Sequence, residues 1–327
     1  AAALTGCSNA QGEGDALTAE DLGGLDPETV RAEAIQKFGV LPDVQANSKR
    51  PLTDAKTTLG RQLFYEKRLS KNQDLACNTC HDLNAYGVDR RSGSVKTSLG
   101  HRGQLGTRNA PTVYNAALHI AQFWDGRAPD VEEQAKGPVL NPVEMAMPAE
   151  AEVISMLKSI PGYMPLFQAA FPGVKDPITY DNVGIAIGAF ERKLVTQDRF
   201  DDYLSGDKDV LSPDEVRGLY VFLNSGCPAC HTGPGVGGEL YRKMGDVKVY
   251  PSNGDTGRFE VTKKEMDRNV FKVPSLRNID RTGPYFHDGS QSTLTAAIRT
   301  MSEYQTIGGK LSDDEVNSIA TFLKSLT

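Results

Sequence analysis

The sequence predicts a mainly α-helical protein built from two similar domains in tandem, with few short strands. The pattern Cys-x-x-Cys-His occurs twice, at residues 77–81 and 227–231. The two copies start 150 positions apart, which is a typical domain length. An apolar stripe at helical spacing leads towards each copy, whereas alternating runs of β-branched residues are scarce. We therefore expect one domain around each copy.

The helix before the first copy is predicted to begin after Thr53, whose hydroxyl can cap it. Its apolar positions are Leu59, Leu63 and Phe64. The segments "AEVISMLKSI" and "NVGIAIGAFERKL" predict further amphipathic helices in this half of the chain.

The helix before the second copy begins with a capping box formed by Ser212 and Glu215, and Pro213 occupies its first turn. The last helix has the same kind of box at Ser312 and Glu315. The predicted apolar stripes are Val216, Leu219, Tyr220 and Leu223 in the first of these helices, and Val316, Ile319, Leu323 and Leu326 in the second. We expect a leader and N-terminal arm over residues 1–46, a first domain over 47–195 and a second over 196–327.

Charge and hydropathy restrict the class of protein. No run of 18 apolar residues is present, so the sequence contains no predicted membrane-spanning helix. The formal net charge is −6, which argues against nucleic acid and favours a cationic protein partner.

The fifth cysteine, Cys7, lies in "LTGC", which is similar to the cleavage site of a bacterial lipoprotein. In that interpretation Cys7 carries a lipid; in the alternative it is a free cysteine in a polar leader. Either way we expect export to the periplasm.

Each Cys-x-x-Cys-His motif is typical of covalent haem attachment. Two cysteines at this spacing can add to the vinyl groups of a haem, and the following histidine can bind its iron. A zinc site would normally bring its two Cys-x-x-Cys pairs close together in sequence. A thiol oxidant would have a strand before the motif and would not explain a second copy. The sequence therefore predicts two c-type haems, on Cys77, Cys80 and His81 and on Cys227, Cys230 and His231.

The residues available for the opposite side of each iron differ between the two domains. His101 lies in the glycine-rich segment "SLGHRGQLGTRN", from which a ligand can move away. His119 lies in an apolar stretch and is predicted to be structural. Met301 follows His231 by 70 positions and is the favoured sixth ligand of the second haem, with Met244, Met266 and Tyr304 as alternatives. A haem with a firmly held sixth ligand, next to a haem whose sixth ligand can leave the iron, is typical of an enzyme.

Four longer motifs carry a resemblance to the bacterial di-haem cytochrome c peroxidase family. They are "GHRGQLGTRNAPTVYN", "AQFWDGRA", "GPVLNPVEMAMP" and "PSLRNIDRTGPYFHDGS", and the similarity extends from about residue 50 to the end. The resemblance implies a peroxidatic, low-potential haem in the first domain, with His101 as its removable ligand, and a high-potential haem in the second, with Met301 as its sixth ligand.

The resemblance also implies roles for other residues. Trp124 matches the tryptophan between the haems, Glu144 the distal acid–base and Gln134 the distal glutamine. A calcium ion is expected between the domains, bound by Asn109 through its side chain and by Thr282 and Pro284 through backbone oxygens.

The implied activity is reduction of hydrogen peroxide to water, with electrons from a small redox protein such as a cytochrome c or a cupredoxin. A homodimer is also implied. The alternatives are a non-enzymatic di-haem electron-transfer cytochrome and a related di-haem oxidase acting on a protein substrate, in which a tyrosine such as Tyr304 replaces the methionine ligand.

Overall fold

The computed structural model describes residues 23–91, 96–251, 254–307 and 309–327. Cys7 and nearly all of the glycine-rich leader lie outside these ranges. The described chain is mainly helical, as predicted, with one two-stranded sheet. The helices are α1 (Pro27–Lys37), α2 (Asp54–Phe64), α3 (Cys77–Cys80), α4 (Val131–Leu140), α5 (Glu150–Lys158), α6 (Tyr163–Ala170), α7 (Tyr180–Glu191), α8 (Arg199–Ser205), α9 (Pro213–Asn224), α10 (Phe259–Thr262), α11 (Leu294–Tyr304) and α12 (Asp313–Lys324).

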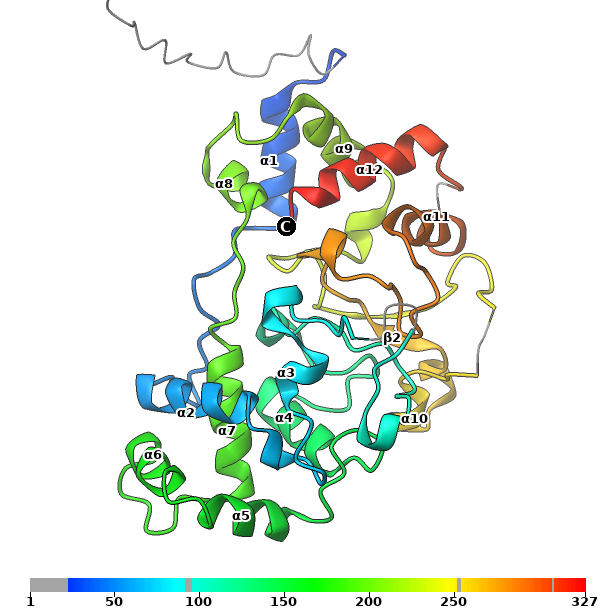
Figure 1. Ribbon diagram of the computed structural model, residues 1–327. Coiled ribbons are helices and arrows are strands. Elements are labelled where there is room, and N and C mark those ends of the chain that lie inside the picture. The colour runs from blue at the N-terminus through cyan, green and yellow to red at the C-terminus, as the bar shows by residue number, and fades with distance from the viewer. Residues whose placement is uncertain (1–22, 92–95, 252–253, 308) are drawn as a thin grey trace, which may run out of the picture.

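Two separate apolar cores divide the described chain into two halves (Figure 1). In the lower half, α2 and α4 pack against α7, and α5 and α6 extend that core. In the upper half, α9 packs against α12, and α1, α8 and α11 complete the core. We call these halves the N-terminal and C-terminal haem units.

The sequence prediction missed α1, which Asp26 caps by accepting hydrogen bonds from the amides of Glu28 and Thr29. Val30 and Ala34 of α1 are buried in the core of the C-terminal unit. The predicted N-terminal arm therefore contributes a helix to the half that is most distant from it in sequence.

A glycine permits the close helix crossing in each unit. A side chain at Gly60 of α2 would meet the carbonyl oxygen of Ala186 in α7 at 1.8 Å. A side chain at Gly218 of α9 would meet the carbonyl oxygen of Ser318 in α12 at 2.0 Å. In each unit this glycine belongs to the helix that precedes the Cys-x-x-Cys-His motif, so the two units repeat the same close helix packing.

The predicted helix caps are confirmed, and one predicted core position is wrong. Ser212 and Glu215 form a capping box on α9, and Ser312 and Glu315 form one on α12. Tyr220, however, is 36% exposed, and Phe222 is buried in its place. The buried face of α9 is turned towards Phe222 because the rings of Phe38 and Phe322 pack against it.

The sheet consists of β1 (Tyr241–Lys243) and β2 (Val270–Lys272), which pair antiparallel with Tyr241 opposite Lys272. The backbone amide of Lys272 also donates a hydrogen bond of 2.8 Å to the carbonyl oxygen of Trp124. This bond joins the C-terminal unit to the N-terminal unit. Among the described helices, none is long and apolar enough to cross a membrane.

Candidate haem centres

The second Cys-x-x-Cys-His motif follows α9 in a short 3-10 turn, Cys227–Ala229. The His231 Nδ1 atom lies 3.3 Å from the carbonyl oxygen of Val236. An Nδ1–H donated to that oxygen orients the ring and leaves the Nε2 lone pair available for a metal. Burial lowers the pKa of His231 to about 4, so the ring is neutral at physiological pH, as an iron ligand must be.

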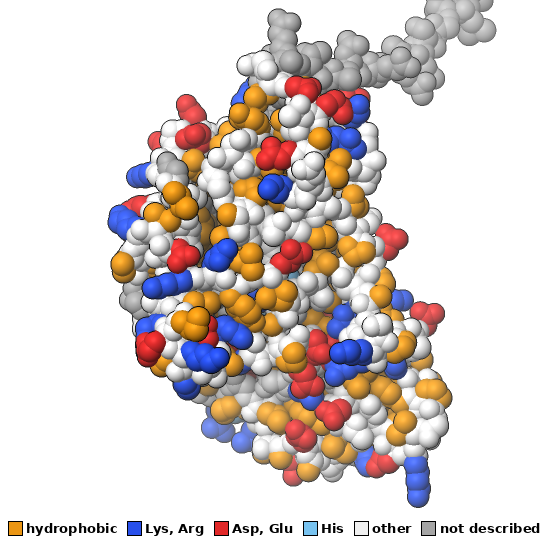
Figure 2. Space-filling model, turned by 180° about the vertical axis from the view of Figure 1, so that it is seen from behind, with side chains coloured by type: hydrophobic (Ala, Val, Ile, Leu, Met, Phe, Trp, Pro, Cys, Tyr) orange, Lys and Arg blue, Asp and Glu red, His pale blue; other side chains and the backbone are white. Residues whose placement is uncertain are grey.

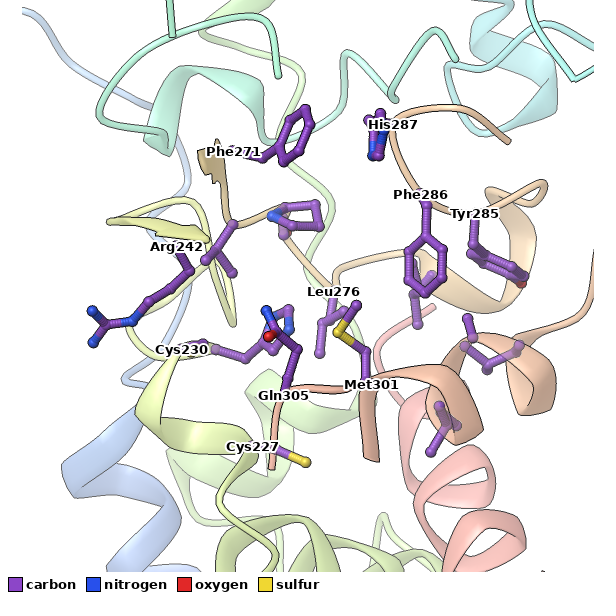
Figure 3. Close-up of a pocket in the computed structure, with 18 of the residues that line it drawn as sticks. Cys227, Cys230, Arg242, Phe271, Leu276, Tyr285, Phe286, His287, Met301 and Gln305 are labelled. Carbon is purple, nitrogen blue, oxygen red and sulfur yellow. The ribbon is translucent and has the colours of Figure 1, made fainter. Parts of the chain in front are cut away.

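A large and mainly apolar cavity lies beside this motif, lined by Cys227, Cys230, His231 and Met301 among others (Figure 3). Met301 comes from α11, and Figure 3 shows its sulfur directed into the cavity. Met244 also lines the cavity, whereas Met266 is 81% exposed and is not among the lining residues. Tyr304 is not a lining residue either, and its ring packs edge-on against Tyr250 at 5.1 Å.

This donor set fits a haem. Two thiols without a disulfide partner, a neutral imidazole and a thioether surround one apolar cavity. Thiols add to vinyl groups, and imidazole with thioether is a known axial pair for haem iron. Burial raises the pKa of Cys227, so its thiol is uncharged in this apolar setting.

The first motif repeats the same local geometry. Cys77 and Cys80 lie in α3, and His81 Nδ1 is 3.3 Å from the carbonyl oxygen of Gly87. Burial raises the pKa of Cys77 to about 12 and of Cys80 to about 11, and it lowers the pKa of His81. Each unit therefore presents two cysteine thiols and one oriented, neutral imidazole.

His101 lies in a 3-10 turn, His101–Gly103, and its side chain is buried with 6% exposure. Its backbone amide donates to the carbonyl oxygens of Val143 and Glu144, at 2.9 and 2.8 Å. The Nδ1 atom is buried and has no hydrogen-bond partner among the described residues. We expected a ligand that can move away; the structure places its side chain in a buried position, on a turn that is bonded to the Glu144 segment.

Glu144 lines a second cavity together with Phe123, Arg127, Glu133 and Asn141, among others. Burial raises the pKa of Glu144, and the charge of Arg127 opposes that rise. Gln134 lies on α4 next to Glu133 but is not among the lining residues. The sequence interpretation missed Arg127, although it stands in the same "AQFWDGRA" motif as Trp124.

Trp124 and the three predicted calcium ligands meet at the boundary between the units. The indole Nε1–H of Trp124 donates to the carbonyl oxygen of Asn109 at 2.9 Å. The side-chain amide of Asn109 lies 2.6 Å from the carbonyl oxygen of Pro284, and Asn109, Thr282 and Pro284 all line the cavity of the C-terminal unit. The structure therefore brings Asn109 beside Pro284, but this contact uses the amide N–H of Asn109 and not the side-chain oxygen that a calcium ion would bind.

A helical fold with two such centres defines a protein that carries two haems. The family model described as di-haem cytochrome c peroxidase matches residues 54–209. The chain is 48% identical to the cytochrome c551 peroxidase of Nitrosomonas europaea over 272 residues, which cover 82% of this chain and 79% of the relative. It is 45% identical to the cytochrome c551 peroxidase of Pseudomonas aeruginosa over 284 residues, covering 85% and 80%.

The chain also resembles a methylamine utilization protein MauG, from Methylorubrum extorquens, at 32% identity over 99% of this chain and 90% of the relative. Among solved structures, a MauG-like protein associated with microbial copper homeostasis matches with a TM-score of 0.76 and 30% identity, covering 88% of this chain and 93% of that one. The chain belongs to the di-haem cytochrome c peroxidase family.

Proposed function

We propose that this di-haem peroxidase reduces hydrogen peroxide at the haem of the N-terminal unit. The observation that carries this assignment is the buried carboxyl of Glu144. It lines a cavity on the segment whose carbonyl oxygens accept hydrogen bonds from the His101 amide. The proposed proton carrier thus belongs to the segment that is hydrogen-bonded to the residue proposed to leave the iron.

When bound, a haem supplies an iron that can bind peroxide and exchange single electrons. The protein must move a proton between the two peroxide oxygens, and Glu144 is the group we assign to this transfer. Burial raises its pKa towards the operating pH, which favours a group that both accepts and releases a proton. Gln134 is proposed to donate a hydrogen bond to the bound peroxide.

The C-terminal unit is proposed to store the second electron. Thioether ligation by Met301 raises the reduction potential of a haem relative to bis-imidazole ligation. Trp124 lies at the unit boundary and lines the cavity of the C-terminal unit, so it is the proposed route for the electron. Covalent attachment through the four cysteines and a calcium ion at Asn109, Thr282 and Pro284 complete the proposed cofactor set.

External electrons are proposed to come one at a time from a small redox protein, a cytochrome c or a cupredoxin, to a homodimeric enzyme in the periplasm. The net charge of −6 favours a cationic donor. It does not locate the docking surface, because acidic and basic side chains are interspersed over the face shown in Figure 2.

The decisive experiment is a peroxide assay on fully oxidised and half-reduced enzyme, with an absorption spectrum of each state. We expect half-reduction to convert the first haem from low spin towards high spin and to raise turnover. His101→Gly should be high spin and active without prior reduction. A fully oxidised wild type that is already high spin and fully active would contradict the gate. A protein without peroxide turnover in either state would instead be an electron-transfer cytochrome.

A further inference from the structure

Lys272 is a buried amine that no carboxylate neutralises among the described residues. It is 7% exposed, and its Nζ atom lies 3.0 Å from Nδ1 of His119. Burial lowers the pKa of Lys272 to about 8. Burying an ammonium group without an anion is costly, so buried charges are normally paired.

His119 has a donor of its own on the other side of its ring. Because Lys272 donates to Nδ1, the remaining proton of the neutral ring is on Nε2. This Nε2 atom is buried and has no partner among the described residues. A buried donor without an acceptor is costly. The two ring nitrogens point to nearly opposite sides of the imidazole, so Nε2–H and the ammonium cannot donate to the same carboxylate. The ammonium, which keeps two N–H donors after bonding Nδ1, by itself matches an anionic oxygen acceptor such as a carboxylate.

Both residues line the cavity of the C-terminal unit. In a haem attached through its vinyl groups, the two propionate carboxylates lie on the edge opposite the thioether bonds. Figure 3 shows Cys227 at one end of the cavity and Phe271 and His287 at the other, with Met301 between them. Lys272 follows Phe271 directly in β2, so its backbone lies towards the end of the cavity that is opposite Cys227.

We propose that Lys272 and His119 form a pair in which the imidazole holds the ammonium in place, and the ammonium receives a propionate of the C-terminal haem and raises the reduction potential of that haem. The proposal rests on the haem assigned above to this unit. A fixed positive charge near the iron stabilises the reduced form, which carries one positive charge fewer, and it does so strongly where water is excluded.

The pair spans both haem units. His119 comes from the N-terminal unit, and its neighbour Ile120 donates a backbone hydrogen bond of 2.9 Å to Gly238 of the C-terminal unit. A side chain at Gly238 would lie 2.2 Å from Cδ2 of His119, so glycine is needed for the ring to fit there. A propionate held by this pair would make the contact between the units part of the haem site.

The test uses the holoenzyme and a spectroelectrochemical titration of the C-terminal haem. Lys272→Met should lower its midpoint potential by at least ~59 mV, a tenfold change in the ratio of reduced to oxidised haem for one electron. Lys272→Arg keeps the charge and should stay close to wild type. His119→Phe should shift the potential in the same direction by a smaller amount. An unchanged potential in a folded Lys272→Met protein would overturn the proposal.

Lys248→Met is the matched control, because it removes the same charge from an exposed lysine that pairs with Glu303. We expect little shift there, since water screens the exposed charge. A crystal structure of the wild-type holoenzyme gives an independent test that requires no variant. A carboxylate oxygen within hydrogen-bond distance of Lys272 Nζ supports the pair, whereas a chloride or a water in that position contradicts it. Haem content and peroxide turnover report separately on the proposed function.

Discussion

The two haem units share the part of the structure that would attach a haem and differ in the part that faces the other side of its iron. In both, a glycine lets two helices cross, a Cys-x-x-Cys-His motif follows, and the histidine Nδ1 lies 3.3 Å from a backbone carbonyl. Of the residues proposed as the sixth iron ligands, Met301 is part of the regular helix α11, whereas His101 occupies a short turn bonded to the Glu144 segment. We infer that the same haem-attachment structure can serve either to store an electron or to react with peroxide. The residue proposed as the sixth iron ligand decides between the two.

The largest effect is expected from removing a group that only the N-terminal unit has. A general acid–base contributes about 10²–10⁴-fold in rate, so Glu144→Gln should slow the reaction of half-reduced enzyme with peroxide by about that factor. Rapid mixing isolates this step from donor binding, and both haem spectra should remain unchanged. Gln134→Ala is the control and should slow this reaction less, because it removes a hydrogen-bond donor and not the group that transfers the proton. If half-reduced Glu144→Gln reacts with peroxide at the wild-type rate, Glu144 is not the acid–base. The N-terminal unit would then have no proton carrier at Glu144 to distinguish it from the C-terminal unit.

A second comparison concerns the buried arginine of each unit. Arg277 in the C-terminal unit is 1% exposed and bonds both Asp198 and Asp201 at 2.6–3.0 Å. Arg277→Leu would leave two carboxylates buried without their cation, and breaking such a network costs about 3–5 kcal/mol. We expect the free energy of unfolding of the C-terminal unit to fall by that amount, measured by denaturant titration followed by circular dichroism.

Arg192→Leu provides the matched variant in the N-terminal unit. Arg192 bonds both oxygens of Glu132 at 2.8 Å, but Arg50 also lies 3.6 Å from Glu132. The remaining cation should make the loss smaller than for Arg277→Leu. Equal losses would show that the second arginine does not compensate.

The N-terminal unit also contains a buried carboxyl that should make its stability depend on pH. Burial and the charge of Glu132 raise the pKa of Glu191 to about 8 in the folded chain, against 4.5 for the free group. The folded state therefore binds this proton more tightly, and its contribution is complete below pH ~4.5 and is lost as the pH rises to about 8. The slope should be at most about 1.4 kcal/mol per pH unit. Glu191→Gln should remove this slope in denaturation measured across that range; an unchanged slope would assign it to other groups.

The smallest effect should come from the proposed calcium site between the units. Asn109 and the carbonyl oxygens of Thr282 and Pro284 belong to different units, so an ion bound by all three would couple them. Coupling free energies between sites are typically ~1–3 kcal/mol, and we expect the low end, a roughly fivefold loss of turnover on chelation. The spin change on half-reduction should also be suppressed. If thorough chelation alters neither, calcium does not transmit the signal.

The sequence was most informative where the physical signal is local. The capping boxes at Ser212 and Ser312 join positions three apart, and they predicted the starts of α9 and α12 correctly. Helix α1 was missed because it buries only Val30 and Ala34, too few apolar positions to show a period. Tyr220 was assigned to the wrong face because the partners of α9, Phe38 and Phe322, come from distant parts of the chain.

The candidate site shows the same limit. The ligands of each haem motif are adjacent in sequence and could be predicted from spacing alone. The contact between His119 and Lys272 joins residues 153 positions apart, and nothing local to either residue indicates it. His119 was predicted to be structural from its apolar neighbours, and its burial agrees with that environment. Its unpartnered nitrogen becomes apparent only once the fold brings Lys272 beside it.

The position of α1 has a consequence for how the chain assembles. The Arg31 side chain donates to the carbonyl oxygens of Tyr203 and Leu204, and the carbonyl oxygen of Lys37 accepts a hydrogen bond from the Gly233 amide. The N-terminal haem unit is therefore an insertion within the chain of the C-terminal unit. During synthesis the inserted unit can complete its own core early, while α1 must wait for Tyr203, Leu204 and Gly233, which emerge after that unit. The loop between α1 and its partners contains the whole N-terminal unit, and closing it costs conformational entropy before the contacts of α1 can stabilise the protein. The docking of α1 should therefore be among the late folding events.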